Sequence, residues 1–284
     1  MLGCACNDPQ VGRRGEFLLW KAAGRTTERQ ATCDDVVRST GWVFNNEAGH
    51  HQTLAEFVRT GDDEVGAYLA VFGLSDTGDD PRHLVEIGSG IGRMTCAFTR
   101  RFRNVTACDL DAGFLQRCRE SVSQFGRPER LSTVEVGDGR TLPLQAGSAD
   151  IAFSYITMQH CDPEDALALT AEAARVVRPG GRVALNYRRR SGIDGLLLPL
   201  GALVRNAFRI PGLGTWLSQR RGAARLGWQT NRLSPDQVLA AIGGQLGAVE
   251  VWHNPGVHVD APGAQAKTFE GINPSHWWLI GTVR

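Results

Sequence analysis

A short apolar segment that runs directly into closely spaced glycines constrains this chain more than any other feature. Val85 to Ile87 is followed by glycine at positions 88, 90 and 92, and an amphipathic segment comes next. Glycine adopts backbone conformations closed to other residues and lets a ligand approach the main chain. A strand, a glycine turn and a helix in this order favour binding of polar or anionic groups at the helix N-terminus. The pattern predicts a ligand site, although a glycine turn alone is weak evidence for one.

From residue 82 onward, short apolar runs alternate with amphipathic segments. The runs predicted as strands are residues 83–87, 105–108, 133–136, 151–155 and 183–186, and the helices predicted between them are residues 91–102, 112–125 and 163–177. Continuous apolar strands that alternate with helices indicate a parallel sheet covered on both faces. Residues 248–253 and 277–283 add a terminal antiparallel pair. We therefore expect an α/β fold, doubly wound and Rossmann-like, with a mostly parallel seven-stranded sheet and an antiparallel last strand.

Three acidic residues lie at or near the ends of the predicted strands. Asp109 lies 21 residues after Gly88, at the end of the second strand, where a carboxylate can accept both hydroxyls of a ribose. Asp138 ends the third strand. Glu86 precedes the first glycine by two residues, and a carboxylate there suits a cationic ligand rather than a pyrophosphate. Asp109 or Asp138 alone could be a turn residue, but in this register with the glycine turn they indicate a ligand site.

Together these features resemble the class I S-adenosylmethionine-dependent methyltransferase family, most clearly over residues 82–187 and more loosely to residue 284. The resemblance implies S-adenosylmethionine as the cofactor and S-adenosylhomocysteine as its product. The residues that it implies for cofactor binding are Glu86, Gly88, Ser89, Gly90, Gly92, Asp109, Leu110, Asp138, Gly139 and Tyr155.

The same resemblance implies a role for most of these residues. Glu86 and the glycine backbone would receive the methionine portion of the cofactor, and Asp109 the ribose. Leu110 would flank the adenine, and Asp138 would accept a hydrogen bond from the adenine amino group. Tyr155 would lie against the methionine end. For Ser89, the alternative to ligand contact is a role in starting the helix.

The segment after the fourth predicted strand bears on what is methylated. It reads Ser-Tyr-Ile-Thr-Met-Gln-His from Ser154 to His160 and lacks the Asp/Asn-Pro-Pro-Tyr sequence of many enzymes that methylate exocyclic amines or glutamine. His160 falls at the carboxyl edge of the sheet, and histidine, which titrates near neutrality, suits a general base for a hydroxyl acceptor. The alternative is that His160 packs under the cofactor or caps the next helix. His258 and His276 are weaker candidates.

We therefore expect O-methylation of a hydroxyl on a small molecule, such as a sugar, a natural product or a lipid-like metabolite. The alternatives are N-methylation of a small amine, methylation of RNA through an arginine-rich segment, and cofactor binding without catalysis. The net charge of +1 argues against a nucleic-acid partner. The sequence carries no signal for an oligomeric state.

Two segments of opposite charge flank the centre of the chain. Residues 47–80 carry eight acids and one arginine, whereas residues 186–233 carry nine arginines and one acid. Residues 1–81 are expected to form a lead-in and lid helices, with a helical stretch over 47–73 that Thr60 to Asp63 interrupts. Residues 82–284 are expected to form the catalytic core, with an inserted helical cap at 187–233. That insert could hold an anionic or amphipathic acceptor or rest on a membrane surface. Alternatively, its arginine face is solvated or docks on the acidic helices.

Cysteine spacing and apolar run lengths bear on metal binding and location. The seven cysteines have no C-x-x-C pair, which argues against a zinc site and a disulfide scaffold, so we expect free thiols and no metal. The longest apolar run, residues 196–204, is far shorter than the roughly 20 residues of a membrane span. We expect a cytoplasmic protein without a transmembrane segment.

Overall fold

The computed structural model describes residues 34, 37, 52–75, 79–208, 210, 212–218, 220–228 and 231–284. The lead-in expected over residues 1–40 therefore lies outside the described residues except for Asp34 and Val37. Asp34 accepts a hydrogen bond from the backbone N–H of Leu54 at 2.6 Å, at the first residue of the helix that precedes the sheet.

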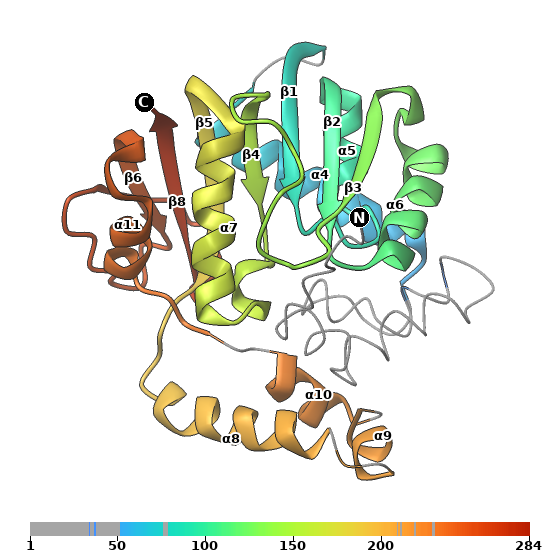
Figure 1. Cartoon of the computed structure of the whole chain (residues 1–284), viewed down its shortest axis with the longest axis vertical. Helices are drawn as coiled ribbons and strands as arrows, with labels where there is room; N and C mark the ends of the chain where they lie inside the picture. Colours follow the sequence, from blue (N-terminus) through green and yellow to red (C-terminus); the bar gives the residue numbers. More distant parts are fainter. Residues whose placement is uncertain are drawn as a thin grey trace, which may run out of the picture.

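A single mixed sheet forms the centre of the described chain (Figure 1). Its strands, in order across the sheet, are β3 (Leu131–Glu135), β2 (Phe102–Asp109), β1 (Asp80–Ile87), β4 (Ala149–Ser154), β5 (Val177–Arg188), β8 (His276–Val283), β6 (Leu246–His253) and β7 (Gln265–Thr268). The first five strands are mutually parallel, and β8 runs antiparallel to both β5 and β6. The strand order therefore reverses at β1 and β4, which is where open α/β sheets bind ligands.

The predicted α/β class and the terminal antiparallel pair are confirmed, but the sheet has eight strands rather than seven. The additional strand, β7, pairs in parallel with β6 at the edge of the sheet. Its four residues, Gln-Ala-Lys-Thr, are polar or small and exposed or half-buried, so they carry no apolar alternation. Such a strand forms because the edge of β6 offers unpaired backbone groups, and it therefore leaves no apolar pattern in the sequence.

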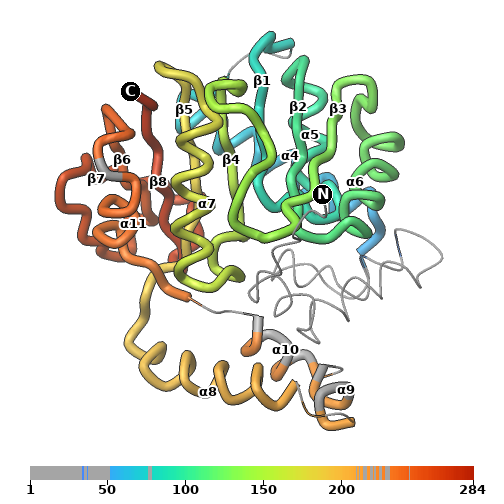
Figure 2. The backbone as a smooth tube through the Cα atoms, in the orientation of Figure 1, coloured from blue at the N-terminus to red at the C-terminus, as the bar shows by residue number. Residues whose placement is uncertain are grey.

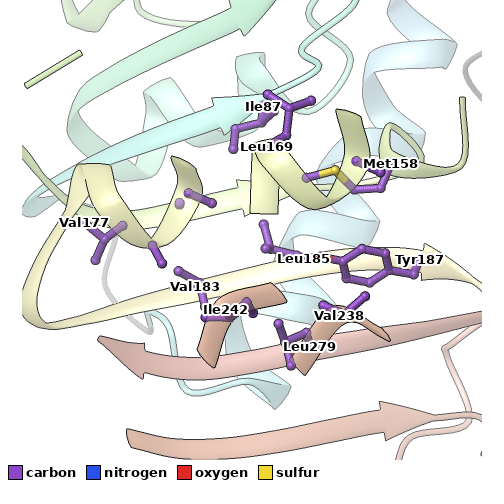
Figure 3. Packing of buried hydrophobic residues seen from close by; sticks show 14 of the residues in the cluster. Ile87, Met158, Leu169, Val177, Val183, Leu185, Tyr187, Val238, Ile242 and Leu279 are labelled. Atoms are coloured by element: carbon purple, nitrogen blue, oxygen red, sulfur yellow. The ribbon is translucent and has the colours of Figure 1, made fainter. Parts of the chain in front are cut away.

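Helices cover both faces of the sheet. Behind it lie α4 (Leu54–Val71) and α5 (Thr95–Arg101), and in front lie α7 (Pro163–Val176) and α11 (Pro235–Ile242), while α6 (Ala112–Phe125) packs on β2 and β3 (Figure 1). Figure 3 shows part of the front layer, where Val238 and Ile242 of α11 lie near Val183 and Leu185 of β5. Burial of each such side chain contributes about 1.5–3 kcal/mol to the free energy of unfolding. This layer therefore holds the antiparallel half of the sheet to the parallel half.

The helix break expected at residues 60–63 is wrong, because α4 continues through them without interruption. Thr53 and Glu56 form a reciprocal capping box that starts this helix. Gly61 is buried, and a Cβ atom built there would overlap the backbone oxygen of Arg93, just after the glycine turn. Glycine is therefore required at position 61 because α4 approaches that turn closely. Local helix propensity cannot predict this requirement, since the contact is with a distant part of the chain.

The helix expected over residues 91–102 is shorter than predicted. Residues 90–94 form turns, and α5 begins at Thr95. The glycine segment therefore extends farther along the chain than the spacing of apolar residues suggested.

The described residues of the expected insert, between β5 and α11, form three helices. They are α8 (Asp194–Ala207), α9 (Leu213–Ser218) and α10 (Arg221–Trp228), and Figure 2 shows them beyond the carboxyl ends of the parallel strands. Asp194 and Arg232 form a buried ion pair at 3.1 Å that ties the beginning of the insert to its end. None of the described helices has the length and apolar character needed to cross a membrane.

Candidate active site

The glycine turn that follows β1 is anchored on the neighbouring strand. The backbone N–H groups of Gly88 and Ser89 both donate to the carbonyl oxygen of Cys108 in β2, at 2.8 and 3.1 Å. Gly88 has a φ of 80°, and a Cβ atom there would overlap the side chain of Thr157, which follows β4. The turn is thus fixed between the carboxyl ends of β2 and β4, with no room for a side chain at its first residue.

Asp109, the last residue of β2, binds the backbone of the glycine turn through its carboxylate. Its carboxylate accepts hydrogen bonds from the backbone N–H of Gly90 at 2.8 Å and of Asp111 at 3.1 Å. Burial raises the pKa of Asp109 to about 6, although these backbone donors oppose the rise. Each carboxylate oxygen can accept more than one hydrogen bond. Asp109 is therefore a largely ionised, buried acceptor in direct contact with the turn at neutral pH.

Glu86 lies on β1, two residues before the turn, and is almost completely buried. Its carboxyl group accepts a hydrogen bond from the Thr95 hydroxyl at 2.6 Å. Burial raises the pKa of Glu86 to about 8, with Thr95 and the positive charge of Arg93 acting in the opposite direction. At neutral pH this carboxyl is mostly protonated, and a cation beside it would favour its ionised form.

Asp138 follows β3, the next strand across the sheet. Its Oδ1 accepts hydrogen bonds from the backbone N–H groups of Arg140 and Thr141, both at 2.8 Å. Partial burial works against ionisation, but the backbone donors outweigh it and hold the pKa of Asp138 below its usual value. Gly139 is buried beside it, and Leu110 is half-buried after β2. The three predicted carboxylates thus come from three adjacent strands, β1, β2 and β3.

Ser89 lies inside the turn, and its side chain faces the interior. Its hydroxyl oxygen is buried and has no hydrogen-bond partner among the described residues. A buried hydroxyl without a partner is costly unless a ligand or water satisfies it. This observation favours ligand contact for Ser89 over a role limited to starting the helix.

Tyr155, at the end of β4, belongs to a cluster that joins the sheet to α4. Its ring stacks on Trp278 with a centroid separation of 5.4 Å, and its hydroxyl lies 3.3 Å from Glu64 of α4. Glu64 also pairs with Arg93 at 2.6 Å. Burial raises the pKa of Tyr155 well above its usual value, so the phenol stays neutral. The predicted contact of Tyr155 with the cofactor stays a prediction.

The residue after Tyr155 has a backbone conformation that the sequence did not reveal. Ile156 has a φ of 53°, in the left-handed region that a β-branched residue rarely adopts. Its N–H donates to the Asn186 side chain at 3.3 Å, and the Asn186 amide donates to the backbone oxygen of Trp277 at the same distance. Such conformations cost about 1–3 kcal/mol and cluster at functional sites. The strained residue follows Tyr155 at the carboxyl end of β4, where the sequence predicted a contact with the cofactor.

The structure separates the three histidines considered from the sequence. His160 is half-buried after β4, with its Nε2 at 3.2 Å from the amide nitrogen of Gln159. His276 begins β8 and is buried, and both of its ring nitrogens have no hydrogen-bond partner in the described part of the chain. His258 lies in an exposed loop, 2.9 Å from Asp260. His160 and His276 therefore remain candidates, and His258 does not.

The environment of His276 keeps its imidazole uncharged. Burial, followed by the positive charges of Arg188, His160 and Arg232, lowers the pKa of His276 to about 3. Its ring also packs edge-on against Tyr155, with centroids 6.4 Å apart. The sequence did not favour His276 over His258, because the burial of His276 comes from packing by other elements and leaves no local pattern.

The sequence predicted no metal site and left open that the acidic segment docks on the arginine-rich insert. Among the described residues, no group of three or more His, Cys, Asp or Glu side chains is arranged to hold a metal ion. Asp62 and Glu64 in the acidic segment pair with Arg100 and Arg93 of the core. These two acids therefore pair with arginines of the core and not with arginines of the insert.

A family model described as a methyltransferase domain matches residues 85–185, which run from β1 to β5. Among curated proteins, the chain is 32% identical over 139 residues to malonyl-[acyl-carrier protein] O-methyltransferase of Serratia marcescens, covering 49% of this chain and 48% of that protein. It is 33% identical over 112 residues to carboxy-S-adenosyl-L-methionine synthase of Pseudomonas fluorescens, covering 38% and 45%. The chain spans about half the length of these relatives.

Two solved structures share the fold at low sequence identity. One is a methyltransferase of Thermotoga maritima described as a possible histamine N-methyltransferase, with a TM-score of 0.50, 16% identity, and coverage of 93% of this chain and 99% of that one. The other is magnesium protoporphyrin IX methyltransferase of Synechocystis with bound S-adenosylhomocysteine, with a TM-score of 0.50, 14% identity, and coverage of 88% and 97%.

Proposed function

We propose that the protein is a class I S-adenosylmethionine-dependent methyltransferase, since residues 85–185 match the model of a methyltransferase domain, and that it transfers a methyl group to a hydroxyl oxygen of a small molecule. The observation that carries the proposal is the placement of two buried carboxyl groups, Glu86 and Asp109, at the ends of adjacent strands on either side of the glycine turn. The relative from Serratia marcescens, an O-methyltransferase by name, supports oxygen as the acceptor atom.

The residues around the turn fit S-adenosylmethionine. Among the described residues, no cationic side chain forms an ion pair with the buried carboxyl of Glu86, and this carboxyl would hold the ammonium group of the methionine portion. Asp109 would accept the ribose hydroxyls, and Asp138 the adenine amino group. Ser89 offers a buried hydroxyl that lacks a partner. At Gly88 the side chain of Thr157 occupies the position that a Cβ would take, so glycine is needed for the turn to pack against the segment after β4.

The acceptor side of the site falls at the ends of β4, β5 and β8. The bound cofactor supplies an electrophilic methyl group on a sulfonium, so the protein must align the acceptor and remove its proton. We assign proton removal to His160, which follows β4 and is half-buried. His276 is neutral and has two ring nitrogens open to hydrogen bonding, and we assign to it the orientation of the acceptor hydroxyl.

We further propose that α4 and the insert of residues 187–233 cover the acceptor. The close approach of Gly61 to Arg93 fixes α4 against the glycine turn. Phe208, just after α8, is buried in the same apolar cluster as Leu54 and Phe57 of α4. Two segments far apart in the sequence therefore meet over the carboxyl ends of the parallel strands, where an acceptor would bind.

Replacing His160 with alanine tests the assignment of the base. We expect turnover to fall by about 100-fold or more, because a positioned general base contributes at least that factor, while affinity for S-adenosylmethionine stays within about twofold. The measurement is transfer of a labelled methyl group to a panel of hydroxylated metabolites. His258→Ala, in an exposed loop, is the matched control and should retain wild-type turnover.

Two results of that experiment would contradict the assignment. A loss of cofactor affinity with unchanged turnover at saturation would show that His160 supports the cofactor site. Unchanged turnover on an amine acceptor would favour N-methylation, since a neutral amine needs no base.

Proton release on cofactor binding tests the role of Glu86. In the free protein, burial raises the pKa of Glu86 from 4.5 to about 8, so the carboxyl retains its proton at pH 7. An ammonium group placed beside it favours the carboxylate, and the proton must leave. We expect calorimetric titrations at pH 7 in buffers of different ionisation enthalpy to report release of close to one proton, and release should vanish above pH 9. Glu86→Gln should bind more weakly and release none, and equal release by both proteins would contradict the role.

A further inference from the structure

The exposed apolar side chains of this protein are concentrated in the insert. Every large apolar residue that is exposed among the described residues lies between Ile193 and Trp216. Leu196 and Leu203 of α8 are the most exposed of its leucines, at 73% and 66% of their surface. A contiguous apolar patch on a folded surface marks an interaction site, whereas single exposed apolar residues are ordinary.

Four of these residues form one stripe along α8. Ile193, Leu196, Leu200 and Leu203 follow each other at intervals of three, four and three residues, which places them within about 80° of the helix circumference. We call these four residues the apolar stripe. The helix rests on its neighbour through another face, since a Cβ on the buried Gly201 would lie 2.9 Å from the backbone oxygen of Leu226 in α10. The stripe is therefore not the surface by which α8 packs on the protein.

The insert is also held in a fixed orientation on the core. Phe208, after α8, is buried in an apolar cluster with residues of α4 and α6, and Val204 and Leu217 pack against that cluster. The buried pair of Asp194 and Arg232 fixes the other end. The stripe thus belongs to an element that is anchored on the core, and its four side chains are exposed.

The charged residues of the insert are almost entirely arginines. Residues 186–233 contain nine arginines and a single acid, Asp194, and that acid is buried in its pair with Arg232. Arg190 is exposed just before the stripe, and Arg220 lies over the exposed ring of Trp216 at 4.8 Å. A second copy of this surface would bring like charges together, whereas an anionic surface complements it.

We propose that the apolar stripe docks on the surface of a lipid bilayer that contains anionic headgroups. Leucine and isoleucine side chains enter the boundary between headgroups and acyl chains, tryptophan lies at that boundary, and arginines contact lipid phosphates. An amphipathic helix of this kind lies in the plane of the interface, as expected for α8, which has 14 residues and is too short to span a membrane. The insert lies beyond the carboxyl ends of the parallel strands, so docking brings that edge of the sheet toward the bilayer (Figure 2).

Co-sedimentation of the whole protein with vesicles tests this proposal without cofactor or acceptor, so its outcome is independent of the proposed methyl transfer. One set of vesicles contains phosphatidylcholine alone and the other contains phosphatidylcholine with phosphatidylglycerol. We expect binding to the anionic vesicles to exceed binding to the neutral ones by about tenfold or more, because each arginine near an anionic surface adds to the binding free energy. Added salt should weaken binding to the anionic vesicles.

Leu196→Glu combined with Leu203→Glu removes the stripe while leaving buried residues untouched. We expect the double variant to bind anionic vesicles about 100-fold more weakly than the wild type and to unfold at the same temperature. The matched control adds the same two charges to an exposed part of α6, as Ser123→Glu with Gln124→Glu, and should bind nearly as well as the wild type.

Three results would overturn the proposal. The first is a folded wild type that does not sediment with anionic vesicles. The second is equal binding by the stripe variant and the α6 control. The third is a wild type that ignores vesicles but doubles its mass in light scattering while the stripe variant does not, which would assign the stripe to a second copy of the chain.

Discussion

Replacing Gly61 with alanine is expected to lower the free energy of unfolding by about 3 kcal/mol. In an ordinary helix interior this change would raise stability by up to about 1 kcal/mol, because alanine is the better helix former. Here the added Cβ would overlap the backbone oxygen of Arg93, which cannot move without displacing the segment after the glycine turn. Overpacking of this kind costs about 1–3 kcal/mol or more. Urea unfolding of the purified variant measures the change.

Gly66, in the same helix, provides the matched control. A Cβ there would meet only the end of the Arg101 side chain at 3.4 Å, and that end can move. Gly66→Ala should therefore stabilise the protein by about 0.5–1 kcal/mol, as in an ordinary helix. A stabilising effect at both positions would show that α4 does not approach the turn as closely as the structure has it.

The contrast between these glycines shows what the sequence can and cannot predict about the fold. The alternation of apolar runs and amphipathic segments predicted the parallel strands, the helices between them and the antiparallel pair, since each element buries one face of its own. The break in α4 was predicted wrongly because local propensity treats Gly61 as a helix breaker. Its actual partner, Arg93, lies 32 residues away in the chain and is found only once the sheet has formed.

The candidate site divides in a similar way. The turn glycines and the three carboxylates were placed correctly at the ends of adjacent strands, because carboxyl ends of parallel strands meet at one edge. The acceptor side gave less signal. The strained backbone of Ile156 depends on Asn186, and the orphaned ring of His276 depends on burial by another strand, so both arise from tertiary packing.

The exposed stripe on α8 lies between these cases. Its spacing is visible in the sequence, and so is the excess of arginine. Amphipathic spacing normally indicates a face that packs on the core, however, and only the structure shows that the stripe points outward while Gly201 faces α10. Only the burial of each residue tells whether such a stripe packs on the core or is exposed, because both kinds of stripe have the same periodicity.

Replacing Asp109 with alanine is expected to weaken binding of S-adenosylmethionine by about a thousandfold. The carboxylate is buried, largely ionised at neutral pH and already oriented by the backbone of Gly90 and Asp111. Two hydrogen bonds from ribose hydroxyls to such a group contribute about 1.5–3 kcal/mol each, which together correspond to that factor. Asp150→Ala is the control, since that carboxylate is bound to His83 and Arg178 at the opposite end of β4.

Calorimetric titration with S-adenosylmethionine and S-adenosylhomocysteine, on the wild type and on Asp109→Ala, tests the central claim most directly. The wild type should bind both compounds, Asp150→Ala should bind them with similar affinity, and Asp109→Ala should bind neither measurably while unfolding cooperatively. A folded wild type that binds neither compound would contradict a methyltransferase function. Undiminished binding by Asp109→Ala would contradict the placement of the cofactor between β1 and β2.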